Sequence, residues 1–172
     1  MSVPLRVLII EDSLDDTLLA LRELHRSNFD PSYKRVEDAA ALNSALAENI
    51  WDLIISDYVL PKFSGLDALA IVRERKLDIP FIMISGKVGE EVVAAAMKLG
   101  AADFVLKDCI HKLSTVVERE LLEAENRRQS RLAGRRLQES EEKFRSLAES
   151  SPNMIFINCK GKIVYVNNIS EE

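Results

Sequence analysis

The sequence predicts an α/β protein built on a doubly wound, five-stranded parallel sheet, with a long C-terminal helix and a partial β-hairpin. Short apolar runs of strand length alternate five times with segments of helical periodicity, which is typical of a parallel sheet covered by helices on both faces. Three of these apolar runs end in charged residues, which would lie together at the carboxyl edge of such a sheet. A hydrophobic content of 47% is enough for a core.

The first two strand–helix pairs occupy residues 5–48. Residues 5–10 form the first expected strand, and Ser13 with Asp16 resembles a capping box that starts a helix. That helix has an apolar stripe at Leu14, Leu18, Leu21 and His25. "YKRV" (33–36) predicts a weak strand at the edge of the sheet. Asp38 is expected to cap a second helix that carries Leu42, Ala45 and Leu46.

The remaining three pairs occupy residues 52–112. Residues 52–56 predict a buried strand, and the helix after it has to end before Pro80. "PFIMIS" (80–85) is the fourth strand, and "EEVVAAAMKLG" (90–100) is a helix that ends at Gly100. "DFVL" (103–106) is the fifth strand, and a last helix begins near His111.

Right-handed crossovers and the flavodoxin-like strand order 2-1-3-4-5 would make the first and third strands neighbours. Glu11 and Asp12, which follow the first strand, would then meet Asp57, which follows the third. At about 4 Å and an effective dielectric constant near 20, each pair of carboxylates repels by about 4 kcal/mol. The cluster therefore needs a cation, and an oxygen-rich site of this kind suits Mg²⁺.

Two further polar groups reach the same edge. Lys107 ends the fifth strand and Ser85 ends the fourth. A divalent ion, a lysine, a hydroxyl and a carboxylate together predict a phosphoryl-transfer site, in which Asp57 can act as the nucleophile and form an aspartyl phosphate.

Residues 3 to about 125 resemble a response-regulator receiver domain of two-component signalling, on the motifs "IIEDS", "DYVLPKFSGLDAL", "MISGKVGEE" and "GAADFVLKD". The resemblance implies that Asp57 accepts a phosphoryl group from a sensor histidine kinase or a phosphotransfer protein. It also implies metal ligands and phosphate contacts. Mg²⁺ would be held by Asp12, Asp57, the backbone carbonyl of Val59 and, often through water, Glu11, whereas Ser85 and Lys107 would bind the phosphoryl oxygens.

Two more expectations follow from this resemblance. Phe104 stands where the family places an aromatic switch that turns inward as Ser85 moves toward phosphate. Asp108 departs from the family, which usually has proline after the lysine, and we expect the Lys107–Asp108 peptide bond to be trans because a non-proline cis bond costs about 2.5–4 kcal/mol.

The chain changes character after residue 112. Residues 113–150 contain no proline and predict a long helix with two heptad seams that are out of phase, with a break near Gly134. The seams consist of Leu113, Val117, Leu121 and Ala124, and of Leu137, Ser140, Phe144 and Leu147. Residues 139–172 resemble the entry helix and first two strands of a PAS domain, whose strands "MIFIN" and "KIVYVN" flank "CKG".

These observations predict three regions and a leading function. A receiver domain spans 1–125, a helical linker or coiled coil spans 113–150 as the continuation of the last receiver helix, and the N-terminal fragment of a PAS domain spans 151–172. The leading hypothesis is a phosphorylation-controlled receiver that relays its state through the long helix to a PAS or output region. The alternatives are a phosphate-independent dimerisation module and a PAS-based sensor of small molecules.

Composition narrows the expected partners. The net charge of −5 does not favour nucleic-acid binding, no apolar run approaches the length of a membrane span, and Cys109 and Cys159 lack the spacing of a zinc site. Two isolated cysteines fit a reducing cytoplasm. The heptad seams of the long helix predict a homodimer that associates through residues 113–150. Whether the whole protein is an enzyme is left open, because any output domain would follow residue 172.

Overall fold

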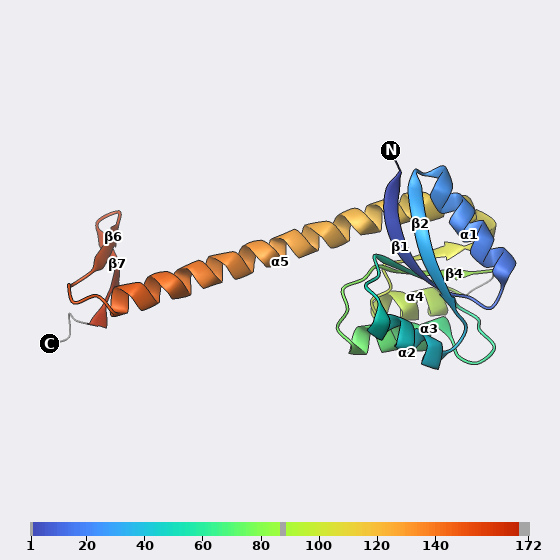
Figure 1. Cartoon of the computed structure of the whole chain (residues 1–172), viewed down its shortest axis with the longest axis horizontal. Helices are drawn as coiled ribbons and strands as arrows, with labels where there is room; N and C mark the ends of the chain where they lie inside the picture. The colour runs from blue at the N-terminus through green and yellow to red at the C-terminus, as the bar shows by residue number, and fades with distance from the viewer. Residues whose placement is uncertain (1, 87–88, 169–172) are drawn as a thin grey trace. The chain divides into compact units, whose positions relative to one another are not determined.

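Five parallel strands form the central sheet in the order β2-β1-β3-β4-β5 (Figure 1), as the sequence predicted. The strands are β1 (Val3–Ile10), β2 (Phe29–Val36), β3 (Leu53–Asp57), β4 (Phe81–Ser85) and β5 (Asp103–Leu106). The computed structural model describes residues 2–86 and 89–168. β2 is longer than "YKRV" and contains Pro31, which a strand tolerates at a sheet edge because one side of its backbone is unpaired.

Helices connect the strands. They are α1 (Leu14–Arg26), α2 (Ala39–Glu48), α3 (Gly65–Glu74), α4 (Glu90–Lys98) and α5 (Leu113–Glu149), with the 3₁₀ helix η1 (Lys107–Lys112) between β5 and α5. The side chains of Ser13, Asp38 and Ser64 cap α1, α2 and α3 by accepting hydrogen bonds from backbone N–H groups in the first turn. Gly100, with φ of 91°, ends the α4 segment in the left-handed conformation that glycine adopts without strain.

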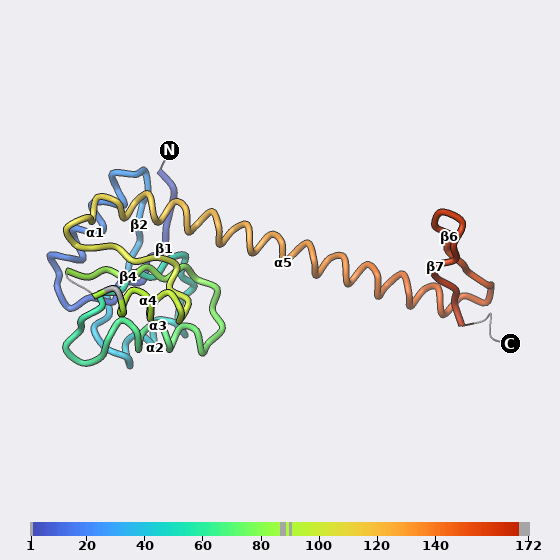
Figure 2. The backbone as a smooth tube through the Cα atoms, turned by 180° about the vertical axis from the view of Figure 1, so that it is seen from behind, coloured from blue at the N-terminus to red at the C-terminus, as the bar shows by residue number. Residues whose placement is uncertain are grey.

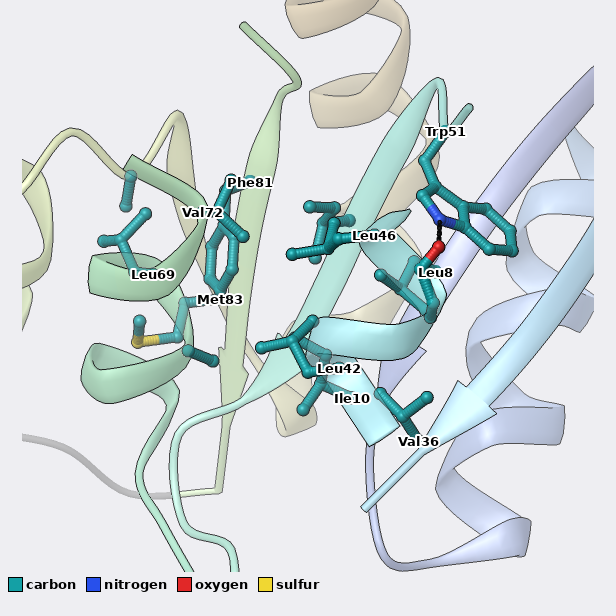
Figure 3. Close-up of a cluster of buried hydrophobic side chains, with 14 of the residues drawn as sticks. Leu8, Ile10, Val36, Leu42, Leu46, Trp51, Leu69, Val72, Phe81 and Met83 are labelled. Carbon is teal, nitrogen blue, oxygen red and sulfur yellow. Dashed lines mark hydrogen bonds between the residues drawn. The ribbon is translucent and has the colours of Figure 1, made fainter. Parts of the chain in front are cut away.

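One face of the sheet is covered by α2, α3 and α4. Figure 3 shows this part of the core, where Leu8, Ile10, Phe81 and Met83 of the sheet pack against helix residues that include Leu42, Leu46, Leu69 and Val72. Trp51 closes one end of this cluster, and its indole Nε1 donates a 2.9 Å hydrogen bond to the carbonyl oxygen of Ala45. The buried indole therefore keeps its polar atom satisfied at the end of α2.

The opposite face is covered by α1 and the first turns of α5 (Figure 2). Leu113 and Val117 of α5 are fully buried against this face, and Leu121 is packed at its margin. The first heptad seam predicted from the sequence is thus largely used by the core of its own domain. The interpretation of Leu113 and Val117 as coiled-coil positions was wrong, because burial against the sheet produces the same spacing as a coiled-coil seam.

The buried face of α1 also differs from the predicted stripe. Thr17, Ala20, Leu21 and Leu24 are buried, whereas Leu14 and Leu18 remain about half exposed and His25 is exposed. Leu21 of the predicted stripe is thus a core residue, but the buried face is rotated toward Thr17, Ala20 and Leu24 and away from Leu14 and Leu18.

The chain divides into two compact units, Met1–Glu125 and Asn126–Glu172. In the second unit, β6 (Phe156–Cys159) and β7 (Lys162–Val166) form an antiparallel hairpin. The buried side chain of Asn167 ties this hairpin to the end of α5, since it accepts from the Ile155 N–H and donates to the carbonyl oxygens of Ala148 and Asn153. Glu149 accepts hydrogen bonds from the Tyr165 hydroxyl and the Asn168 N–H.

Gly65 begins α3 directly against the backbone at the end of β3. A Cβ atom at this position would lie 2.6 Å from the carbonyl oxygen of Asp57, a distance that real side chains do not adopt. The Gly65 N–H also donates a 2.9 Å hydrogen bond to the carbonyl oxygen of Tyr58. The absence of a side chain at residue 65 is therefore a condition for placing Asp57 where it is.

We predict that Gly65→Ala destabilises the first unit by about 1–3 kcal/mol, because the methyl group forces the α3 start and the Asp57 backbone apart. Urea unfolding followed by circular dichroism measures this change. Gly134→Ala is the matched control, since nothing lies within 4 Å of its Cβ position in α5 and alanine favours a helix by up to about 1 kcal/mol over glycine. Equal effects in the two variants would contradict the close-approach argument.

Candidate functional site

The carboxyl ends of β1, β3 and β5 deliver charged residues to one edge of the sheet. Ile10, which precedes Glu11, is paired with Ser56, which precedes Asp57. β4 and β5 continue the same edge, where Asp57 is in register with Ile84 and Ser85 with Leu106. Parallel pairing therefore brings residues that are about 50 positions apart in the chain to a single site.

Lys107 is the cation at the centre of this site. Its Nζ donates a 2.7 Å hydrogen bond to Asp57 Oδ2 and a 2.5 Å hydrogen bond to Asp16 Oδ2, and it lies 3.6 Å from Glu11 Oε2. Burial by itself would lower the pKa of Lys107, but the hydrogen bonds to Asp16 and Asp57 outweigh it and raise that pKa above its usual value. The ammonium group therefore stays charged in the neutral pH range.

Glu11 is the carboxylate most affected by its surroundings. Burial raises the pKa of Glu11 to about 7, a 3.0 Å hydrogen bond from the Ser13 N–H to Oε1 opposes part of that rise, and the charge of Asp57 adds to it. Glu11 thus takes up a proton far more readily than an exposed glutamate does.

Glu11, Asp12 and Asp57 can share one metal ion. Each offers a carboxylate oxygen, these three oxygens lie within 4.8 Å of one another, and Asp12 is exposed where the other two are buried. Hard oxygen ligands on one open side suit Mg²⁺, which retains several of its waters. The three converging carboxylates, one of them exposed to solvent, therefore fit the predicted ion.

Val59 lies beside the Asp57 carboxylate. Its N–H donates a 3.3 Å hydrogen bond to Asp57 Oδ1, and it forms an isolated β-bridge with Ser64 just before α3. The backbone predicted to supply a metal ligand therefore lies beside the Asp57 carboxylate and is held by the bridge to Ser64.

Ser85 and Phe104 occupy the neighbouring strands. Ser85 is the last residue of β4 and is buried, and Phe104 of β5 is in register with Met83 and packs, half-buried, against the face that α2, α3 and α4 cover. Part of the "MISGKVGEE" motif, Lys87 and Val88, lies outside the described residues. The Lys107–Asp108 peptide bond is trans, as expected.

Two residues of the site were not identified as such from the sequence. Asp16 was assigned to the cap of α1, and its N–H does donate to Ser13 Oγ, but its carboxylate binds Lys107. Arg35 of β2 donates hydrogen bonds of 3.1 Å and 3.0 Å to the carbonyl oxygens of Glu11 and Asp12. The first-turn position of Asp16, next to a strand end that carries carboxylates, was a usable signal, whereas nothing local marked Arg35.

Comparison with known proteins places this arrangement in a family. Residues 7–118 match the family model described as the response regulator receiver domain. The chain is 38% identical over 125 residues to the methanogenesis regulatory protein FilR1 of Methanothrix harundinacea, a match that covers 67% of this chain and 27% of that protein. It is 34% identical over 111 residues to protein-glutamate methylesterase/protein-glutamine glutaminase 2 of Caulobacter vibrioides, covering 63% of this chain and 32% of that protein.

A solved structure shows the same relationship. The signal receiver domain of NarL from Mycobacterium tuberculosis is 27% identical, with a TM-score of 0.59, and the match covers 72% of this chain and 98% of that domain. The chain thus spans about a third or less of the two curated relatives but nearly all of an isolated receiver domain. Each of the two curated relatives matches this chain over one segment only, and the names of these two proteins describe different activities.

We predict that the free energy of unfolding of the metal-free protein falls as the pH rises from about 4.5 to about 7. In this window the folded state keeps the Glu11 proton that the unfolded state has lost, so the folded state binds more protons and loses stability with increasing pH. The loss at this residue should be about 1–3 kcal/mol, because water and Lys107 screen part of the effect.

Denaturant unfolding at several pH values in the presence of a chelator measures this loss, and Glu11→Gln should remove most of it. Glu118→Gln, a change at an exposed glutamate of α5, is the matched control and should leave the pH dependence as in the wild type. Adding Mg²⁺ at pH 8 should restore stability to the wild type. A Glu11→Gln variant with the full wild-type pH dependence would contradict the assignment.

Proposed function

The chain belongs to the response regulator receiver family, and on this premise we propose that Asp57 accepts a phosphoryl group from a sensor histidine kinase or a phosphotransfer protein. Receiver domains of two-component signalling take phosphate from histidine kinases, and the site described above supplies the groups that this transfer requires. The observation that carries the proposal is the contact of 2.7 Å between Lys107 Nζ and Asp57 Oδ2, beside the Glu11–Asp12 pair.

In the proposed reaction, an Asp57 carboxylate oxygen attacks phosphorus in line with the bond to the donor's histidine nitrogen. The new bond from phosphorus to oxygen forms as the bond from phosphorus to nitrogen breaks, and the imidazole nitrogen keeps the electron pair. Lys107 places a fixed positive charge beside the acceptor, where charge spreads over the transferred oxygens. Ser85, at the end of the adjacent strand, would bind one of these oxygens after transfer.

Mg²⁺ would be held by Asp12, Asp57, the carbonyl oxygen of Val59 and, through water, Glu11, and it supplies positive charge to the phosphoryl oxygens. The protein's part in this is to keep the carboxylates converged. β1 and β3 fix their backbones, Arg35 holds the main chain of Glu11 and Asp12, and Gly65 leaves room for the Asp57 backbone.

The signal would then pass along β5 and α5. Phe104 on β5 is half-buried, which is consistent with an aromatic side chain that changes its packing when Ser85 moves. α5 begins six residues after Lys107, with its first turn buried on the sheet face behind the site. Phosphorylation would thus alter the packing of the first turns of α5 and be relayed through residues 113–150.

For residues 151–172 we propose the N-terminal fragment of a PAS domain. The β6–β7 hairpin leaves most of its apolar side chains exposed, and a two-stranded hairpin is at best marginally stable alone. The exposed apolar residues are Met154, Phe156, Ile157, Ile163, Val164 and Val166. These side chains would be buried by further strands of such a domain.

The described helices include none that is both long and apolar enough to cross a bilayer.

We predict that a small phosphodonor with Mg²⁺ labels the wild-type chain and that Asp57→Asn abolishes the label, because the amide is not a competent nucleophile. The label should be stable in acid and labile in base, as an acyl phosphate is. Intact mass spectrometry measures its stoichiometry. Asp67→Asn, which changes the capping carboxylate of α3, is a control that should still be labelled. A chain that never takes the label would leave the alternative, a phosphate-independent interaction module.

We predict that the chain forms a homodimer through residues 113–150, which requires the second heptad seam because the first is largely buried in its own domain. Leu137 and Leu147 are 62% and 72% exposed, and a helix with such positions gains free energy when they pair. Light scattering should give a dimer mass for the wild type and a monomer mass for the Leu137→Glu/Leu147→Glu double variant.

Leu122→Glu is the control for this experiment, since Leu122 is 63% exposed but lies off the seam. A monomeric wild type at high concentration, with and without phosphodonor, would rule out the paired helices.

A further inference from the structure

We propose that Asp16 is a positioning residue that holds the Lys107 ammonium group at the acceptor and so sets the rate at which Asp57 takes up a phosphoryl group. This inference rests on the proposed function and adds to it a residue outside the motifs that define the site. Asp16 lies on α1, whereas Asp57 is the last residue of β3 and Lys107 follows β5 as the first residue of η1.

The contacts place Asp16 at the lysine rather than at the metal ligands. Lys107 Nζ is 2.5 Å from Asp16 Oδ2 and 2.7 Å from Asp57 Oδ2, so the two carboxylates share one ammonium group. Glu11 Oε2 follows at 3.6 Å. Of the carboxylates around Nζ, Asp16 makes the shortest contact, although Glu11, Asp12 and Asp57 make up the acidic cluster that could hold a metal.

The backbone of Asp16 is fixed by the N-terminal cap of α1. Its N–H donates a 3.2 Å hydrogen bond to Ser13 Oγ, and the following residue, the buried Thr17, donates from N and Oγ1 to the carbonyl oxygen of Ser13. Asp16 therefore presents its carboxylate from a rigid first turn. A short, fixed side chain of this kind is suited to orienting a long one.

Lys107 needs such a partner because its stem has four rotatable bonds. The space beside it is a cavity of about 20 Å³, room for about one water molecule, whose walls are largely apolar. Its lining includes Ile9, Ile55, Ile84 and Ile110. Apolar walls do not orient an ammonium group, so the carboxylates that also line the cavity determine where Nζ lies. Asp16 and Asp57 hold it at hydrogen-bond distance, and Glu11 is farther away at 3.6 Å.

Loss of the Asp16 charge has two consequences for transfer. Nζ either remains on Asp57 alone, where it withdraws more charge from the attacking oxygen, or moves toward Glu11 and away from the incoming phosphoryl group. Both slow the reaction. Removing a negative charge also lessens the repulsion of an anionic phosphodonor. Removing the charge of the neighbouring Asp15 has the same effect, so an Asp15 variant measures how large this effect is.

Asp15→Asn is the matched control. Asp15 and Asp16 are adjacent in the first turn of α1, so each variant removes one charge from the same helix N-terminus, while Asp15 is exposed. With acetyl phosphate as donor and Mg²⁺ in excess, Asp16→Asn should lower the rate constant for labelling Asp57 by about three- to tenfold relative to Asp15→Asn. Asp16→Glu should recover part of the rate.

Lys107→Met supplies the test of mechanism. If Asp16 acts through Lys107, then Asp16→Asn has no further effect on the rate in the Lys107→Met background, because the group it positions is gone. The ¹⁵N resonance of the Lys107 ammonium group gives a readout independent of the reaction, and it should shift in Asp16→Asn but not in Asp15→Asn.

The outcomes separate the two proposals. A wild-type chain that takes no label at Asp57 overturns the proposed function. If the wild type is labelled, two results would overturn the role of Asp16 and leave the proposed function standing. Either Asp16→Asn is labelled as fast as Asp15→Asn, or the effect of Asp16→Asn is the same in the Lys107→Met background as in the wild type. A slower Asp16→Asn variant whose defect disappears in the Lys107→Met background establishes the positioning role.

Discussion

The sharing of one lysine among several carboxylates is the interaction on which the site depends. Parallel pairing of β1 with β3 brings Glu11 and Asp12 next to Asp57, and the repulsion among them is offset by Lys107 from the end of β5. Three carboxylates, those of Glu11, Asp16 and Asp57, surround the single ammonium group of Lys107, and Asp12 lies beside them. Burial raises the pKa of Glu11, and the nearby charge of Asp57 adds to that rise. Because Lys107 neutralises only part of the carboxylate charge, the site is suited to binding a divalent cation and, together with it, a phosphoryl group.

The scaffold holds this arrangement by contacts that do not neutralise it. Arg35 could have paired with a carboxylate of the cluster, but its guanidinium binds the carbonyl oxygens of Glu11 and Asp12 and the side chain of Glu37. The loop is thereby fixed while its acidic side chains stay available. Gly65 serves the other side of the site, where the close approach of α3 to the Asp57 backbone leaves no room for a Cβ atom.

The same strands connect the site to α5. Ile55 and Ile84 lie two and one residues before Asp57 and Ser85, and both belong to the core cluster in which Leu113 and Val117 of α5 are buried. A change in packing at the ends of β3 and β4 therefore has a short physical route to the first turn of α5. In the second unit, Asn167 and Glu149 connect the hairpin to the C-terminal turn of the same helix through hydrogen bonds, of which the one from Asn167 to the Ala148 carbonyl oxygen is buried.

The sequence by itself determined the sheet, its strand order and the residues at its carboxyl edge, because strand periodicity and right-handed crossovers are local and chiral constraints. Only the tertiary structure decided how side chains are shared. Thr17 and Ala20 rather than Leu14 and Leu18 face the core, and Leu113 and Val117 serve the sheet rather than a coiled coil. The contacts of Asp16 and Arg35 in the site were likewise decided by the tertiary structure. Each joins elements that are distant in the sequence, and such a contact depends on packing that no local pattern encodes.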